Sequence, residues 1–295
     1  MHIAVLLWGF TGVLGRAIEL DAPVLVWYRM LMTAVIIAVI IQFRKQWVQI
    51  EKKDLVQLSI VGGLMGLHWV AFYGAIKFAN ASIALVCLST TPVFTTLFNF
   101  LVSKTKYEFK ELLLGGLALL GMFLIYQFQQ LYVLGITLGI IAAVLAALFT
   151  VLNKRIAHKY PARPMVFYEM ASGLIFISLL MPFQLIYFPE TNLTPTLSDL
   201  LWLVVLSLCC TVWAQSLALD ALKHISSFTA TLSVNLEPVY GILLAFLIYK
   251  ENAELHAGFY LGMGLILLSV ILQMLRLLKP LKMSPGFIKE KGGIE

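Results

Sequence analysis

Charged residues are scarce in this chain. Asp, Glu, Lys and Arg together make up 12% of its 295 residues, whereas 61% are hydrophobic. This composition excludes a water-soluble globule, which needs more polar residues to cover its surface. Ten-residue segments of alternating hydrophobicity, the pattern of membrane barrel strands, are also missing. The sequence therefore predicts an all-α integral membrane protein, because helices satisfy their own backbone groups in lipid.

Cysteines and enzyme motifs are scarce as well. The three cysteines, Cys87, Cys209 and Cys210, lie in apolar segments, so neither a disulfide framework nor a metal site is expected. The sequence contains no HExxH, GxSxG or Walker-type motif and no pair of intramembrane aspartates. These absences disfavour an enzyme, a bound cofactor and transport driven by ATP binding to this chain.

Ten apolar segments have lengths near the ~20 residues that a helix needs to cross a ~30 Å hydrocarbon core. They cover residues 3–18, 24–42, 55–76, 81–102, 110–127, 132–152, 164–187, 199–220, 226–249 and 256–276. If the N-terminus is cytoplasmic, the outer loops contain only Arg16, Lys77 and Lys250 as basic residues, as the distribution of Lys and Arg in membrane proteins requires. Both termini are therefore predicted to be cytoplasmic, and the net charge of +6 needs no nucleic-acid partner. Residues 277–295 are predicted to form a basic, disordered tail near the lipid headgroups.

The two halves of the chain repeat one another. Pro92 and Pro238 lie 146 residues apart, and near the start of each half an offset of 139 pairs residues 10–11 with residues 149–150. Because each half contains five predicted helices, the second half enters the membrane from the opposite side. Inverted repeats of this kind are typical of secondary transporters and place a substrate site near the midplane. The predicted repeats are residues 1–128 and 129–276.

Both prolines fall near the middle of their predicted helices. Proline cannot donate to the carbonyl four residues earlier, so we expect helix breaks at Pro92 and Pro238 whose free carbonyls face protein, water or substrate. A simple packing kink is the alternative for either proline alone. Glu237 directly precedes the second break, and a carboxylate inside a membrane usually faces a cavity. Glu237 could bind an amine-bearing substrate, carry a coupling proton or make a structural hydrogen bond.

Polar and aromatic residues on five of the predicted helices are candidates for the lining of a central cavity. Aromatic rings stack on organic solutes and their polar edges orient them, although Trp and Tyr also serve in helix packing. On the ninth predicted helix a spacing of three to four residues places Ser233, Glu237 and Tyr240 on one face. The full set is Trp8, Thr11, His68, Trp69, Tyr73, Ser89, Thr91, Trp213, Gln215, Ser233, Glu237 and Tyr240.

Arg29 and Glu169 occupy equivalent positions in the second and seventh predicted helices. Inversion places them toward opposite faces, where each could gate its own mouth of the cavity or, like Glu237, take part in coupling. The alternative for Arg29 is a side chain that reaches the outer interface and meets acidic residues there. For Glu169 the alternative is a contact with Arg155 or Lys159 at the inner surface.

Several of these features together resemble the EamA-type transporters of the drug/metabolite transporter superfamily. The likeness covers nearly all of residues 1–276. It is carried by the two five-helix halves, the Trp8-Gly9 opening, the Tyr28-Arg29 pair, the segment from Ala75 to Pro92 and the Glu237-Pro238 pair. The resemblance implies a ten-helix carrier of a bacterial inner membrane, often an exporter of amino acids, metabolites or drugs. Relatives that carry sugar phosphates tend to have basic cavity residues, so Glu237 disfavours a dianionic substrate.

The sequence thus predicts a secondary transporter of a small organic solute that works by alternating access in the lipid bilayer. A proton or other ion gradient, exchange or the substrate's own gradient would drive it. The alternative is a non-transporting membrane scaffold or partner protein, which would have a dry, fully packed interface between its halves. The sequence leaves open the substrate, the direction of transport, the coupling ion and whether the chain forms a homodimer.

Overall fold

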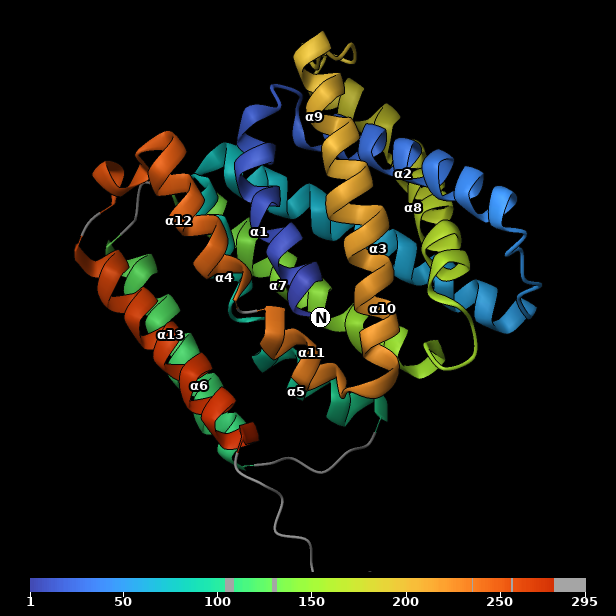
Figure 1. The fold of residues 1–295 in the computed structure, drawn as a ribbon. Helices are drawn as coiled ribbons and strands as arrows, with labels where there is room; N and C mark the ends of the chain where they lie inside the picture. The colour runs from blue at the N-terminus through green and yellow to red at the C-terminus, as the bar shows by residue number, and fades with distance from the viewer. Residues whose placement is uncertain (104–108, 129–131, 235, 256, 279–295) are drawn as a thin grey trace, which may run out of the picture.

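The computed structural model describes residues 1–103, 109–128, 132–234, 236–255 and 257–278 (Figure 1). Within these ranges the chain is helical, with short connections and no strand, which confirms the predicted all-α class. The helices are α1 (His2–Ala17), α2 (Ala22–Arg44), α3 (Lys52–Phe78), α4 (Ala81–Leu88), α5 (Thr91–Ser103), α6 (Phe109–Phe128), α7 (Val133–Ile156), α8 (Ala162–Tyr187), α9 (Leu197–Ser207), η2 (Leu208–Trp213), α10 (Ala214–His224), α11 (Ser227–Val234), α12 (Glu237–Tyr249), η3 (Glu251–Glu254) and α13 (Ala257–Leu278). Of the predicted tail, residues 279–295 lie outside the described ranges.

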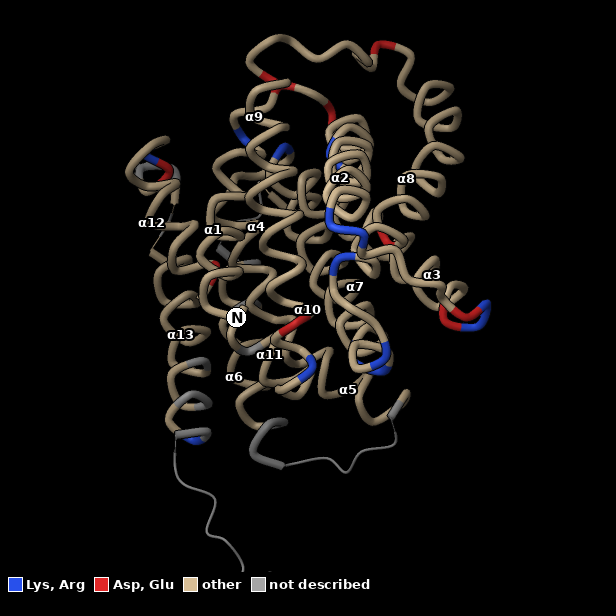
Figure 2. The backbone as a smooth tube through the Cα atoms, turned by 45° about the vertical axis from the view of Figure 1, so that its right-hand side comes forward, with Lys and Arg blue, Asp and Glu red and all other residues tan. Residues whose placement is uncertain are grey.

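Six helical segments of the described ranges are long and apolar enough to cross a membrane. They are Ala22–Arg44, Lys52–Phe78, Ala81–Val102, Val133–Ile156, Ala162–Tyr187 and Leu197–His224. Four shorter apolar helices, His2–Ala17, Leu113–Ile125, Glu237–Tyr249 and Ala257–Ser269, occupy the remaining predicted ranges. Figure 2 shows that charged residues gather mainly at the ends of the helices, with long uncharged stretches between them.

α1 passes through the middle of the bundle and packs closely on its neighbours through glycines (Figure 1). A Cβ atom added at Gly9 would lie 2.8 Å from Cβ of Tyr240 in α12, and one at Gly15 would lie 2.5 Å from the ring of Tyr73 in α3. Small residues at such positions let helix backbones approach one another in a membrane. α6 and α13 form a separate pair at one side of the bundle, where they run side by side.

The helical segments that contain the two prolines are both interrupted. α4 ends at Leu88 and α5 begins at Thr91, while α11 ends at Val234 and α12 begins at Glu237. The carbonyl of Leu88, which Pro92 cannot serve, accepts a hydrogen bond from Oγ1 of Thr91 at 2.6 Å. A threonine hydroxyl therefore replaces the missing backbone donor at the first interruption.

The segment between α9 and α10 is a π-helical turn, η2, which contains Cys209 and Cys210. Its hydroxyl-bearing residue, Thr211, donates to the carbonyl of Leu206 at 3.1 Å. The carbonyl of Cys210 accepts a hydrogen bond from Nε1 of Trp8 at 3.0 Å, so α1 is tied to this turn. π-helical turns widen a helix locally and are frequent at functional sites.

Candidate functional site

A cavity of about 110 Å³ lies among α1, α3, α7, α10 and the two interrupted segments. This volume is enough to hold several water molecules. Leu88 and Thr91 line the cavity at the first interruption, and Val234 and Glu237 line it at the second. The cavity extends toward the end of the bundle where α1 begins, since Met1 also contributes to its wall. Both helix interruptions therefore meet at one space inside the protein.

Glu237 is the acidic residue of the cavity wall. It is 6% exposed, and its Oε1 accepts a hydrogen bond from Oγ1 of Thr11 at 3.4 Å. It also occupies the first residue of α12, where the unpaired N–H groups of a helix favour a negative charge. The ion pairs of the described residues do not include Glu237. Its carboxylate is therefore available to a positively charged group that enters the cavity.

Arg29 lines the same cavity and carries the opposite charge. Its Nη1 donates to the hydroxyl of Tyr73 at 2.7 Å, its Nε donates to Oγ1 of Thr211 at 2.9 Å, and its guanidinium lies 3.8 Å from the ring centroid of Trp69. The side chain is 1% exposed, so the alternative in which it reaches the outer interface is wrong. The protein instead holds a guanidinium deep in its interior by hydrogen bonds and cation–π contact.

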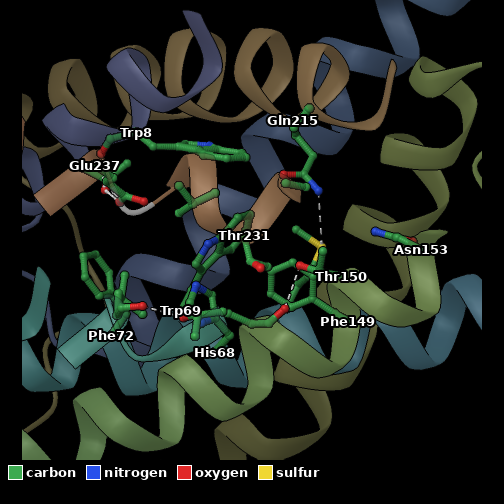
Figure 3. A pocket seen from close by; sticks show the side chains of 18 of the residues that line it. Trp8, His68, Trp69, Phe72, Phe149, Thr150, Asn153, Gln215, Thr231 and Glu237 are labelled. Atoms are coloured by element: carbon green, nitrogen blue, oxygen red, sulfur yellow. Dashed lines mark hydrogen bonds between the residues drawn. The ribbon is translucent and has the colours of Figure 1, made fainter. Parts of the chain in front are cut away.

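Aromatic rings form the walls between these charges. In Figure 3, Trp8 and Gln215 lie on one side of the cavity, and His68, Trp69 and Phe149 face them from the other. Nδ1 of His68 is 2.8 Å from the carbonyl oxygen of Ala142, so this histidine is engaged in contact between α3 and α7. Flat apolar walls with few polar groups are typical of sites for small organic molecules.

The structure brings eight of the sequence-predicted candidates together at this cavity and places the others elsewhere. The eight are Trp8, Thr11, Arg29, His68, Trp69, Thr91, Gln215 and Glu237. Tyr73 is buried behind Arg29, and Ser89 is buried within the first interruption. Ser233 is half-buried and donates to the carbonyl of Thr229 at 3.0 Å. Tyr240 packs on Gly9 instead.

Two of these placements correct the predicted helix faces. Trp213 is 53% exposed and lines a groove on the outside of the bundle. Gln215 follows two residues later, about 200° further around the helix, and its side chain faces the cavity. In the ninth predicted helix the cavity face contains Thr231 and Val234 before Glu237, not Ser233. The helix stops at Val234 and starts again at Glu237, so one continuous periodicity does not describe it.

Sequence reasoning missed several residues of the wall, among them a group on α7. Phe149, Thr150 and Asn153 line the cavity from this helix, and Thr231 lines it from α11. The repeat contained a signal for Thr150, because the offset of 139 pairs it with Thr11. No comparable signal marks Asn153, whose counterpart in the first half is an apolar leucine.

Glu169 lies close to the cavity but not in its wall. It is 0% exposed in α8, and its polar neighbours are the side chains of Asn153 and Gln215. The alternative contact with Arg155 or Lys159 is wrong, because the Glu169 oxygens have no hydrogen-bond partner among the described residues, and Lys159 binds Asp54 at 2.9 Å at the end of the bundle. That hydrogen bond raises the pKa of Lys159, which lies in the connection between α7 and α8.

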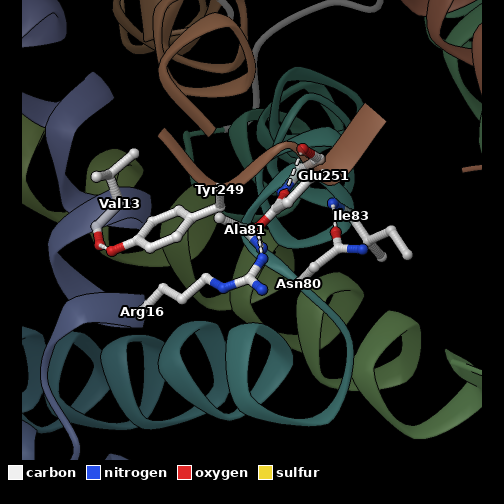
Figure 4. Close-up of polar contacts among 8 residues, drawn as sticks. Val13, Arg16, Asn80, Ala81, Ile83, Tyr249 and Glu251 are labelled. Carbon is white, nitrogen blue, oxygen red and sulfur yellow. Dashed lines mark hydrogen bonds and ion pairs between the residues drawn. The ribbon is translucent and has the colours of Figure 1, made fainter. Parts of the chain in front are cut away.

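A polar cluster, the Glu251 clamp, lies at the end of the bundle where α1 finishes and is formed by Arg16, Ala81, Ser82 and Glu251. Figure 4 shows Arg16, Ala81 and Glu251 of this cluster. The Glu251 carboxylate is 0% exposed and accepts hydrogen bonds from Nη1 of Arg16, from Oγ of Ser82 at 2.6 Å, and from the backbone N–H groups of Ser82 at 2.9 Å and Ala81 at 3.2 Å. The clamp therefore joins α1, α4 and the first residue of η3.

Comparison with known proteins agrees with this architecture. The sequence profile described as the EamA-like transporter family matches residues 1–127 and 133–275. The chain belongs to the EamA-like transporter family. The resemblance predicted from the sequence is thus confirmed, and the protein is an integral membrane protein of a transporter family.

Two curated relatives of this EamA-like transporter are themselves named only as uncharacterized transporters. The relative from Archaeoglobus fulgidus is 26% identical over 246 residues, which covers 80% of this chain and 82% of that protein. The relative from Synechocystis is 31% identical over 119 residues, which covers 39% of this chain and 36% of that protein. A solved structure described only as "Crystal structure of protein" has the same fold, with a TM-score of 0.67 at 19% identity over 94% of this chain and 96% of that one.

Proposed function

We propose that this EamA-like transporter is a secondary carrier that moves a small organic solute across a bacterial inner membrane by alternating access. The observation that carries the proposal is the central cavity, where both helix interruptions meet and where Arg29 and Glu237 expose opposite charges. Interrupted helices at mid-depth are the usual substrate sites of inverted-repeat transporters.

Ten membrane crossings, arranged as two inverted halves of residues 1–128 and 129–276, complete this proposal. Helices in equivalent positions of the two halves pack on one another, α2 on α8 and α6 on α13, as expected when a two-fold axis in the membrane plane passes between them. The distribution of Lys and Arg supports cytoplasmic termini. The Glu251 clamp would then face outward and the cavity would communicate with the cytoplasm.

Alternating access requires that one end of the path be closed while the other is open. The Glu251 clamp and the apolar cluster of Val13, Ala81 and Ala245 close the path at the end where α1 finishes. The cavity extends toward the opposite end, where Asn153 and Leu222 contribute to its wall. In the other state, a rocking movement would break the clamp and bring the cytoplasmic ends of α7 and α10 together. The residues of the cavity wall would then be open to the outside.

The cavity fits a solute that contains an ammonium group, such as an amino acid or an amine. Glu237 would bind the ammonium group, Arg29 would attract a carboxylate if the solute has one, and Trp8, Trp69 and Phe149 would contact its apolar part. Export is the direction that the family resemblance favours.

A scaffold without transport activity is the second candidate. It would need no internal space between its halves, whereas this protein has a cavity whose wall includes an arginine and a glutamate. Burial of charged groups is costly in a membrane, and such groups usually mark substrate or ion pathways. A cavity with these two charged groups in its wall therefore favours the carrier.

The test is flux through liposomes that contain the purified protein and a panel of radiolabelled amino acids and primary amines. We expect Glu237→Gln to reduce saturable flux of the transported solute by about ten- to hundredfold, the equivalent of a charged hydrogen bond of about 1.5–3 kcal/mol. Glu190→Gln, which removes the same charge from an exposed residue, is the matched control. Wild-type flux in Glu237→Gln would remove this carboxylate from the mechanism.

A further inference from the structure

Glu169 is a buried acidic residue that the cavity wall does not explain. It is 0% exposed, and neither of its carboxylate oxygens has a hydrogen-bond partner among the described residues. Its backbone is fixed where α3 and α8 touch, since a Cβ atom added at Gly62 would lie 2.2 Å from the carbonyl oxygen of Glu169. A buried carboxylate without partners is destabilised by several kcal/mol relative to its neutral form.

No charged group of the helices around α8 acts directly on Glu169 in the described part of the chain. α8 packs on α2, α3 and α10, and Asn153 approaches it from α7. The titratable and charged groups of these helices near the site are Arg29, bound to Thr211 and Tyr73; Asp54, bound to Lys159 and Tyr160; His68, at the carbonyl of Ala142; Lys154, bound to the carbonyls of Leu222 and Ile225; and Asp220, bound to Lys223. No cation therefore neutralises the Glu169 carboxylate within the described residues.

The two amides beside Glu169 also have incomplete hydrogen bonding. Oδ1 of Asn153 is buried and has no donor among the described residues. Nε2 of Gln215 has only Sδ of Met65, at 3.9 Å, which is a weak acceptor. Both amides line the cavity (Figure 3). They therefore separate Glu169 from the solute space and contact both.

A single proton satisfies this arrangement. Without a proton, the nearby amides of Asn153 and Gln215 do not reach hydrogen-bond geometry with the Glu169 oxygens, and Oδ1 of Asn153 also lacks a donor among the described residues. With a proton, Glu169 gains one O–H donor, which can bind Oδ1 of Asn153, while its carbonyl oxygen can accept from the amide of Gln215. Protonation also removes the buried charge. A metal ion would need a larger set of ligands, and the described residues contain no cluster of three or more His, Cys, Asp or Glu side chains that could hold one.

We propose that Glu169, with Asn153 as its hydrogen-bond partner, is a proton-binding site distinct from Glu237, and that it couples transport to the proton gradient. This inference rests on the proposed carrier function. The Glu169 carboxylate takes up a proton from water in the cavity. It releases this proton to water when the cavity opens to the other side of the membrane. A solute that binds the amides of Asn153 and Gln215 withdraws them from Glu169, so solute binding and proton binding influence each other.

The first test needs no solute, because its probe is the proton. Infrared difference spectra of the purified protein in lipid nanodiscs, recorded across a pH titration, report the C=O stretch of buried carboxylic acids. We expect a band that Glu169→Gln abolishes and the matched variant Glu237→Gln retains. Asn153→Ala should move this band to the higher frequency of a carboxylic acid that lacks a hydrogen bond. Persistence of the whole band in Glu169→Gln would overturn the proton site, and an unmoved band in Asn153→Ala would overturn the pairing.

The second test separates coupling from transport itself, with a solute identified in the flux panel. One pH unit is about 1.36 kcal/mol, so it supports up to about tenfold accumulation in one-to-one exchange with a proton. We expect Glu169→Gln liposomes to lose this accumulation but to keep solute–solute exchange without a gradient. Accumulation by Glu169→Gln would overturn the coupling role. Failure of the wild-type protein to exchange any solute would instead refute the carrier function, and the infrared result would be unaffected.

Discussion

Replacement of Glu251 by Gln should open the clamped end of the path. In the structure this carboxylate accepts hydrogen bonds from Arg16, from both donors of Ser82 and from the backbone of Ala81. A glutamine retains one acceptor oxygen but presents an NH₂ group to the remaining donors. Because the Arg16 side chain is 33% exposed, its ion pair contributes less than a buried one.

The expected magnitude follows from the bonds that glutamine cannot make. Loss of one to two charge-assisted hydrogen bonds weakens the closed end by about 2–3 kcal/mol, after allowance for water that replaces them. This change shifts the equilibrium by roughly 30- to 150-fold toward conformations open at that end.

Ala245 provides the assay position, because it is 0% exposed in the apolar cluster beneath the clamp. In a protein whose three native cysteines are replaced by Ala, Ala245→Cys should react with a membrane-impermeant maleimide at least tenfold faster when Glu251→Gln is also present. Glu190→Gln, an exposed change, should leave the rate unchanged. Equal labelling rates with and without Glu251→Gln would refute the clamp as a barrier.

Two further substitutions test the interior. Gly62→Ala should lower thermal stability by about 1–3 kcal/mol or prevent folding, because its Cβ atom would clash with the backbone of Glu169, whereas Gly116→Ala, with nothing within 4 Å, should be neutral or stabilising in the same detergent melts. Arg29→Lys should also lower the melting temperature, since an ammonium group cannot bind Tyr73 and stack on Trp69 as the guanidinium does; an unchanged melt would contradict that account.

Much of the helical framework could be predicted from the sequence, because the length of each apolar segment decides whether it can form a membrane-spanning helix. The residues of the site were predictable only where local helix geometry is regular. Trp213 and Gln215 look like one polar-edged group in the sequence, yet their side chains point to different sides of their helix. Ser233 was expected beside Glu237 because a spacing of four residues places both on one face of a continuous helix. In the structure α11 ends at Val234 and α12 begins at Glu237, so this spacing does not apply.

Long-range partners were beyond sequence reasoning for a different reason. The oxygen that fixes Nε of Arg29 belongs to Thr211, which lies 182 residues away in the chain. A basic residue six positions inside a helix is equally compatible with a reach toward water, and only the packed neighbours decide between the two. The repeat was the one non-local signal available, and it related Thr11 to Thr150 but contained nothing about Asn153.

The carbonyl of Cys210 accepts from the indole of Trp8 at 3.0 Å and lies 3.5 Å from Nη2 of Arg29. This acceptor belongs to the main chain, so no substitution at position 210 can delete it while the π-turn persists. A substitution of Cys210 by a side chain of similar size would therefore leave the hydrogen bonds of α1 and α2 to this carbonyl oxygen in place. Such substitutions at position 210 should leave the contacts of Trp8 and Arg29 unchanged. A change that restores ordinary α-helical winding nearby should weaken both contacts together.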